Sequence, residues 1–122
     1  MILKLKSHFF FIILLILSAG ILIYFSYYNE FCEGGPDNTW HYYFSKYALT
    51  YPDFFLHHWG KPLFILLSTW FAQFGFFGIK IFNVLCGILS TIVAYKILSH
   101  LKVSFKWIIA PLLLFSPLLS IL

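Results

Sequence analysis

The sequence is poor in charged residues. Of its 122 residues, 10% are Asp, Glu, Lys or Arg, whereas 61% are hydrophobic and 23% are aromatic. A soluble globular domain carries roughly 25% charged residues, because polar groups must cover its surface. The composition therefore argues against a soluble enzyme, a disordered chain or a disulfide scaffold, and it predicts an integral membrane protein.

Arginine is absent, since all eight basic residues are lysines. Proteins that read nucleic acid rely on Arg forks and clustered basic faces. These lysines are scattered, so no nucleic-acid partner is expected. Cysteine is scarce too: Cys32 lies in a polar stretch and Cys86 in an apolar run. A disulfide between them is not expected, and no spacing fits a zinc site.

Long stretches also lack charge, and the first of them predicts a membrane helix. No Asp, Glu, Lys or Arg occurs between Lys6 and Glu30. Residues 9–28 are long enough to cross about 30 Å of hydrocarbon at about 1.5 Å per residue. A cleaved signal peptide, cut near residues 18–20, is the alternative. The apolar run continues through Phe25, past the usual end of a signal core, which favours an uncleaved transmembrane helix.

Three further apolar stretches follow, at residues 62–77, 79–98 and 107–122. The excess of lysine expected on the cytoplasmic side selects among the competing topologies. If 62–77 crossed the membrane, three lysines would lie inside; if it lies along the interface, five do. We therefore predict an all-α membrane protein with its N-terminus in the cytoplasm. Its parts are a tail and first transmembrane helix (1–28, spanning at 9–28), an outer loop (29–78), a second span (79–98), a cytoplasmic loop (99–106) and a third span (107–122).

The last apolar stretch is short and interrupted. Residues 107–122 contain Pro111 and Pro117, and no polar anchor follows them. A last membrane helix normally ends in a charged or polar flank. Two interpretations are open: the chain ends at the membrane face, or it is the first part of a longer protein and its third span is truncated. We favour the second interpretation.

The polar chemistry is concentrated in residues 29–61. All four acidic residues and three of the five histidines lie there with two lysines, giving a net charge of −2, against +6 for the rest of the chain. This segment is therefore the predicted functional one. The side chains concerned are Glu30, Glu33, Asp37, Asp53, His41, His57, His58, Lys46 and Lys61.

Two short helices are predicted within the outer loop. Residues 33–36 form a turn, and Asp37 follows as a helix N-cap. Aromatic residues then recur at helical spacing, a stripe suited to the headgroup depth of a membrane surface. The stripe comprises Trp40, Tyr43, Phe44, Tyr47, Ala48 and Tyr51. Residues 56–62 form a polar loop, and Pro62 suits the first turn of a second interfacial helix.

The order of these motifs resembles the beginning of a known family. Gly35-Pro36-Asp37-Asn38 follows the first membrane helix, and His58-Trp59-Gly60-Lys61-Pro62-Leu63 follows the first interfacial helix. Gly75 and Gly78 then precede the second span. Over residues 5–100 this arrangement resembles the GT-C type membrane glycosyltransferases, a superfamily that includes the protein mannosyltransferases and the lipid A aminoarabinose transferases. Asn38 stands where many members have a second carboxylate.

The resemblance implies sugar transfer at the outer face of a bacterial inner membrane. The donor would be a polyprenyl-phosphate sugar, the acceptor a glycan, lipid or protein, and this chain the N-terminal portion of the enzyme. Such a reaction needs a carboxylate that deprotonates the acceptor and a cation or hydrogen-bond donor for the departing phosphate. Asp37 matches the family's acidic position and is the candidate general base.

Four further residues are candidates for substrate binding by their position in the outer loop. Lys61, His57 and His58 would contact phosphate or sugar. His41 follows Asp37 by one helical turn, so it would tune the carboxylate or help to hold a divalent metal. No cofactor other than that metal is implied.

Each candidate also has a purely structural explanation. Asp37 can cap a helix, His41 can be a surface hydrogen-bonding partner, His57 and His58 can be interfacial residues beside Trp59, and Lys61 can anchor a headgroup. The competing hypothesis for the chain is a small non-enzymatic membrane subunit or assembly factor. Three spans do not enclose a polyprenyl site, so we expect no activity from this piece alone. The reading frame beyond Leu122 separates the two hypotheses.

Overall fold

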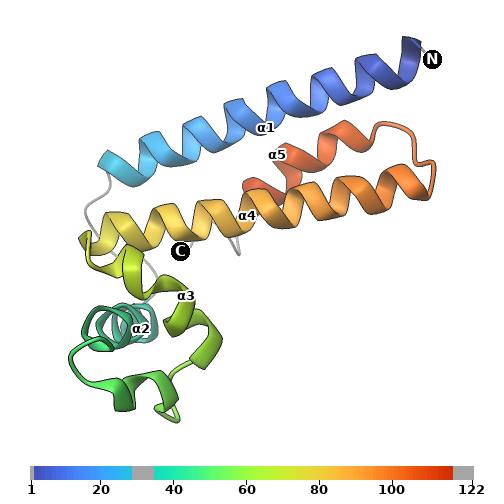
Figure 1. The fold of residues 1–122 in the computed structure, drawn as a ribbon. Coiled ribbons are helices and arrows are strands. Elements are labelled where there is room, and N and C mark those ends of the chain that lie inside the picture. The colour runs from blue at the N-terminus through green and yellow to red at the C-terminus, as the bar shows by residue number, and fades with distance from the viewer. Residues whose placement is uncertain (1, 29–34, 117–122) are drawn as a thin grey trace. The chain divides into compact units, whose positions relative to one another are not determined.

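The computed structural model describes residues 2–28 and 35–116, and all regular structure within these ranges is helical, without a strand (Figure 1). The predicted all-α class is therefore confirmed. The α-helices are α1 (Ile2–Tyr28), α2 (Gly35–Tyr47), α3 (Pro62–Ala72), α4 (Gly75–His100) and α5 (Ile109–Leu114), and the short 3-10 helices are η1 (Pro52–Leu56) and η2 (Lys106–Ile108).

Two of these helices are long and apolar enough to cross a membrane. They are the 22-residue part of α1 from Ser7 to Tyr28 and the 26-residue α4. The predicted spans 9–28 and 79–98 lie within them. Within the third predicted span, residues 107–116 contain the end of η2 and the six-residue α5, while residues 117–122 lie outside the described part. The third span stays a prediction.

Helix α3 begins where the sequence predicts a second short helix. Pro62 occupies its first position, where the missing N–H costs nothing because that group has no partner within a helix. The helix has 11 residues, or about 17 Å at about 1.5 Å per residue, well short of a bilayer core of about 30 Å. A new helix starts at Gly75, whose φ of 77° is a left-handed conformation that favours glycine. The length of α3 thus disfavours the topology in which residues 62–77 cross the membrane.

The described chain forms two compact units. Among the described residues, unit 1 consists of 2–25 and 84–116, and unit 2 of 26–28 and 35–83. In unit 1, α1, α4 and α5 each contribute one residue to a buried cluster of Phe11, Tyr95 and Ala110. The Phe11 and Tyr95 rings stack with their centroids 3.8 Å apart.

Unit 2 is built on the packing of α2 against α3, with η1 beside them. Two buried clusters hold it together, one of Phe44, Ala48 and Ile65 and one of Tyr42, Ala72 and Ile79. Between the helices, the hydroxyl oxygens of Ser45 and Ser68 lie 2.8 Å apart in a buried hydrogen bond. The Gln73 side-chain amide adds a bond of 3.0 Å to the backbone carbonyl of Lys46. Hydroxyl and amide groups therefore contribute to this interface beside apolar contacts.

The long helices and α3 expose many large apolar side chains, while several of their hydroxyl groups are buried. On α3, Trp70 is 69% exposed whereas Ser68 and Thr69 are buried. On α4, Leu89 is exposed whereas Thr91 is buried. Each threonine donates a hydrogen bond to the carbonyl one turn back, at 2.6 Å for Thr69 and 2.8 Å for Thr91. A helix at the surface of a soluble protein has the opposite pattern, so these outer faces fit an apolar solvent.

The predicted aromatic stripe of α2 divides into two sets. Phe44 and Ala48 are buried in the contact with α3 and η1, whereas Trp40, Tyr43 and Tyr47 are exposed. The prediction of a single surface stripe is therefore wrong for Phe44 and Ala48. Spacing along one helix does not reveal that a second helix will cover part of the stripe.

The ends of α2 also differ from the prediction. The helix begins at Gly35, so Asp37 lies in its first turn instead of at the N-cap position. It ends at Tyr47, where the N–H groups of Thr50 and Tyr51 both bond to the Tyr47 carbonyl, at 3.0 and 2.8 Å. Tyr51 thus lies beyond the helix. The acidic residues Glu30 and Glu33, and also Cys32, fall outside the described residues.

Candidate functional site

Asp37 occupies the first turn of α2 and is exposed. A carboxylate at this place interacts favourably with the positive end of the helix dipole. His41 follows one turn later on the same side of the helix. The predicted pairing of a carboxylate with an imidazole at this spacing is therefore compatible with the helix, which extends through both residues.

His41 lies where α2 faces α3. Its ring meets the Phe64 ring edge to face, with centroids 5.8 Å apart. Its Nδ1 atom is buried and has no hydrogen-bond partner among the described residues. Burial lowers the pKa of His41, the Lys61 ammonium lowers it further, and the Asp37 carboxylate opposes both. The neutral imidazole is thus the favoured form.

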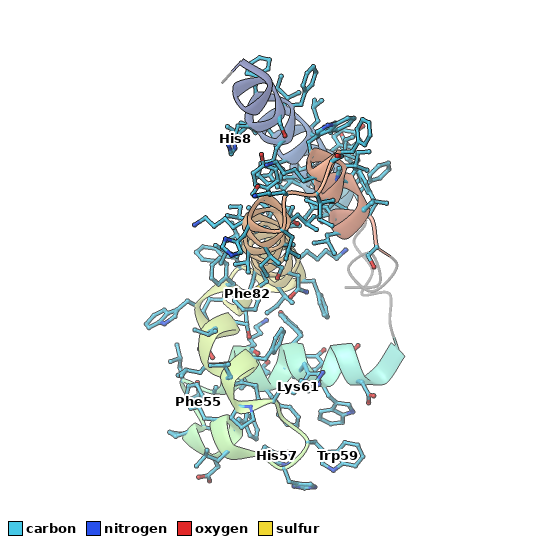
Figure 2. The ribbon with its side chains drawn as sticks, turned by 90° about the vertical axis from the view of Figure 1, so that its right-hand side faces the viewer. His8, Phe55, His57, Trp59, Lys61 and Phe82 are labelled. Carbon is cyan, nitrogen blue, oxygen red and sulfur yellow. The ribbon has the colours of Figure 1, made fainter. Side chains whose placement is uncertain are left out.

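Lys61 also influences His41, although it belongs to the start of α3 and not to α2. It is the N-cap residue of α3, in an extended backbone conformation, and its side chain is exposed. Its carbonyl accepts the first hydrogen bond of α3, from the N–H of the buried Ile65 at 2.9 Å. Figure 2 shows Lys61 beside α2, consistent with its electrostatic effect on His41.

His57 and His58 form a second group, in the turn before α3. Their rings stack with centroids 4.6 Å apart, and the His57 ring lies 4.7 Å from that of Phe44 on α2. The backbone N–H of Trp59 donates to His57 Nδ1 at 3.3 Å. His58 is exposed, and its ring centroid lies 6.0 Å from that of Trp59. Figure 2 shows His57 and Trp59 on the same turn.

The five predicted site residues therefore fall into two groups within unit 2. Asp37 and Lys61 share an electrostatic neighbourhood around His41, whereas His57 and His58 contact each other and the surrounding aromatic rings. In residues 35–116 no hydrogen bond or ring contact joins the histidine pair to Asp37 or Lys61. The two groups therefore pack against different aromatic rings: His41 contacts Phe64, whereas His57 contacts Phe44.

Sequence reasoning missed the environment of Lys46. Its ammonium lies 5.4 Å from the ring centroid of Tyr42, one turn earlier, and 6.0 Å from that of Tyr47. A hydrogen bond with the Tyr42 side chain raises the pKa of Lys46. The spacing of four residues between Tyr42 and Lys46 could have predicted this contact, because such residues are neighbours on a helix surface. Lys46 thus lies beside two tyrosine rings in the last turn of α2.

A metal centre has little support from the donors present. Among the described residues, no group of three or more His, Cys, Asp and Glu side chains is placed to hold a metal ion. Asp37 and His41 are two donors at most. The divalent metal named above for His41 stays a prediction.

Comparison with known proteins adds no family to this geometry. No family model matches the chain, and the comparisons found no matching curated protein and no matching solved structure.

Proposed function

We propose that this chain carries the first part of an integral membrane glycosyltransferase of the GT-C type, which moves a sugar from a polyprenyl-phosphate donor to an acceptor at the outer membrane face. One observation carries the proposal: α2, with Asp37 in its first turn, packs against α3, whose N-cap residue is Lys61, and His41 lies in that contact against Phe64. These two charges come from residues 24 positions apart, so the fold of unit 2 is what brings them together.

The charges have complementary tasks in such a transfer. The exposed Asp37 carboxylate accepts the proton of the acceptor hydroxyl or amine as that nucleophile attacks the anomeric carbon. The lipid phosphate then leaves, and the Lys61 ammonium stabilises the charge that develops on it. Burial chiefly lowers the pKa of His41, so its neutral ring adds no third charge to the neighbourhood of these two groups. His57 and His58 supply further contacts to sugar or phosphate.

The proposal includes an arrangement in a bacterial inner membrane. Residues 9–28, 79–98 and 107–122 cross the bilayer, the N-terminus is cytoplasmic, and α2 and α3 lie along the outer interface. The exposed apolar side chains of α1, α3 and α4 support this arrangement, because lipid is the solvent that such faces match. The partners are the membrane, a lipid-linked sugar and the acceptor.

Cysteine labelling tests the topology without any assay of activity. Cys32 belongs to the outer loop in this arrangement, and Cys86 to the middle of α4. A membrane-impermeant maleimide added to intact cells is expected to label Cys32 in a Cys86→Ala variant. The reciprocal Cys32→Ala variant should stay unlabelled until the membrane is dissolved. Protection of Cys32 in intact cells would contradict the topology.

Sugar transfer by the complete gene product tests the chemistry. Asp37→Asn keeps the size of the side chain but removes the base, so transfer from a polyprenyl-linked sugar in isolated membranes should fall about 100-fold to 10,000-fold. Asp53→Asn is the matched control, since Asp53 is also exposed but lies on η1, and it should leave transfer unchanged. Full activity in the Asp37→Asn enzyme would refute its role. Absence of transfer in the unmodified product would favour a non-enzymatic subunit.

A further inference from the structure

One end of unit 1 is basic without any acidic counterpart. Lys96 and His100 lie near the end of α4, and Lys102 and Lys106 follow in the connection to α5. No Asp or Glu occurs in residues 1–29 or 54–122. The start of α1 lies at this same end, because His8 Nδ1 and the Tyr95 hydroxyl are hydrogen-bonded at 2.9 Å. Figure 1 shows the connection from α4 to α5 near the beginning of α1.

The connection is held in a defined conformation. The N–H of Val103 bonds to the Leu98 carbonyl at 3.0 Å, and that of Lys102 bonds to the Ser99 carbonyl at 3.3 Å. Lys102 has a φ of 55°. This is the hydrogen-bonding pattern in which a helix usually ends with a left-handed glycine, yet the position is occupied by lysine. The fold therefore places Lys102 in a conformation that glycine adopts with less strain.

Phe105, three residues later, also has a left-handed backbone conformation, with a φ of 59°. Its ring meets the Trp107 ring with centroids 6.2 Å apart, and Trp107 in turn lies 6.1 Å from Phe10 on α1. Phe10 and Phe105 are exposed. Exposed aromatic rings thus stand next to the basic residues instead of being buried below them.

Lys106 connects the basic and the aromatic parts of this end. Its ammonium lies 5.5 Å from the ring centroid of Tyr95, a ring that is buried and stacked on Phe11. Cation–π contact with Tyr95 fixes the direction of the lysine. Ammonium groups beside exposed aromatic rings match the boundary between phospholipid headgroups and acyl chains, where aromatic side chains gather and lysine heads reach the phosphates.

We propose that the basic end of unit 1, formed by Lys96, Lys102 and Lys106 with the rings of Phe105 and Trp107, binds the phosphate groups of anionic phospholipids. The occupant is a lipid headgroup and not an acidic protein, because exposed apolar side chains (Leu101, Val103 and Phe105) alternate with the lysines. The acidic surface of a water-soluble protein offers no apolar surroundings for these side chains, whereas the acyl chains of a lipid do. The inference rests on the proposal that unit 1 spans a membrane, and it is independent of sugar transfer.

Quenching of tryptophan fluorescence by brominated lipids tests this binding. The four tryptophans are Trp40, Trp59, Trp70 and Trp107, so replacing the first three by Phe leaves a reporter at the basic end. The whole chain would be placed in phosphatidylcholine bilayers in which either the phosphatidylglycerol or the phosphatidylcholine component is brominated. Brominated phosphatidylglycerol should quench Trp107 beyond its share of the bilayer, and raised salt should weaken this preference.

Removal of the lysines provides the decisive comparison. Each of Lys102→Gln and Lys106→Gln should reduce the preference of Trp107 for the anionic lipid about fivefold, the factor expected for one lysine at an anionic surface. Lys46→Gln removes the same charge from unit 2 and should leave the preference unchanged. Equal quenching by the two brominated lipids in the parent chain, or an equal effect of Lys46→Gln, would overturn the proposal.

A second measurement uses the unmodified chain, so it does not depend on the tryptophan replacements. Native mass spectrometry of protein released from mixed bilayers should find phosphatidylglycerol retained more often than phosphatidylcholine, with the excess lost in Lys102→Gln/Lys106→Gln. Added inorganic phosphate should not displace the lipid, whereas displacement by an acidic peptide would identify a protein site and refute the lipid one. If brominated phosphatidylcholine fails to quench Trp107 at all, the membrane placement fails as well.

Discussion

The two compact units differ in the use they make of polar groups. Unit 2 contains Asp37 and Asp53, three histidines and a buried hydroxyl pair between its helices. Unit 1 has no acidic residue, and a hydrogen bond between His8 and Tyr95 accompanies its stacked rings. Side chains of both signs of charge thus occur together in unit 2. The charges of unit 1 are all of one sign and suit a surface.

The largest expected effect concerns the glycines of the two units. A Cβ on Gly78 would collide with the backbone carbonyl oxygen of Phe71, which cannot move without distorting α3, whereas a Cβ on Gly20 would meet nothing. Gly78→Ala should lower the free energy of unfolding by about 3 kcal/mol. Gly20→Ala should raise it by about 0.5 kcal/mol, because alanine favours a helix. Thermal unfolding in detergent compares them, and equal midpoints would contradict the close packing of Gly78.

A smaller effect is expected from adding bulk at two serines. Ser68 is 0% exposed and bonded to Ser45, whereas Ser90 is exposed on α4. Ser68→Leu should cost about 2 kcal/mol, since it overfills the contact of α2 with α3. Ser90→Leu should be close to neutral in detergent. Chemical denaturation with helicity as the signal measures both, and a neutral Ser68→Leu would mean that unit 2 tolerates rearrangement of its interface.

The polar contact of unit 1 should matter less. Tyr95→Phe keeps the ring that stacks on Phe11 and removes the hydroxyl that bonds to His8. Because interhelical hydrogen bonds within membranes contribute little, the loss should be about 0.6 kcal/mol. His8→Ala and the double variant complete a mutant cycle that isolates the bond. A coupling energy above about 2 kcal/mol would show that unit 1 depends on this contact as strongly as unit 2 depends on its serines.

The smallest effect is a dependence of unit 2 on pH. Burial lowers the pKa of His41 below its ordinary value of 6.5, so the folded state binds fewer protons there than the unfolded state. The free energy of unfolding is therefore highest above pH 6.5 and decreases as the pH falls below 6.5, where the unfolded state takes up a proton first. The unfolding midpoint should drop between about pH 8 and about pH 5. His41→Gln should reduce this drop, and an unchanged drop would assign it to other groups.

The long helices were predictable because their signal is local. Residues 9–28 and 79–98 are long, mainly apolar runs, and Pro62 marks the start of α3. Each of these features is found within a helix of the structure. The burial of Phe44 and Ala48 was not predictable in this way. It depends on α3 and η1, which approach α2 from residues further along the chain, and the spacing within α2 contains no record of that contact.

The candidate site shows the same division. The placement of Asp37 and His41 one turn apart follows from helical spacing alone. The approach of Lys61 to His41 requires α3 to fold back on α2, and that of His57 to Phe44 requires η1 to do so. The sequence could therefore propose these residues but could not group them. The roles in catalysis and binding, like the third span, stay predictions.

The division into units also has a consequence for the order of folding. The described residues of unit 2 all fall within 26–83, a stretch of the sequence inserted between the two parts of unit 1. Its contacts join residues near in sequence, so their loop-closure entropy is small. Unit 1 pairs α1 with helices that are synthesised more than half a chain later. During synthesis, therefore, α2 and α3 can pack against each other before α4 and α5, the helices that contact α1, have been made.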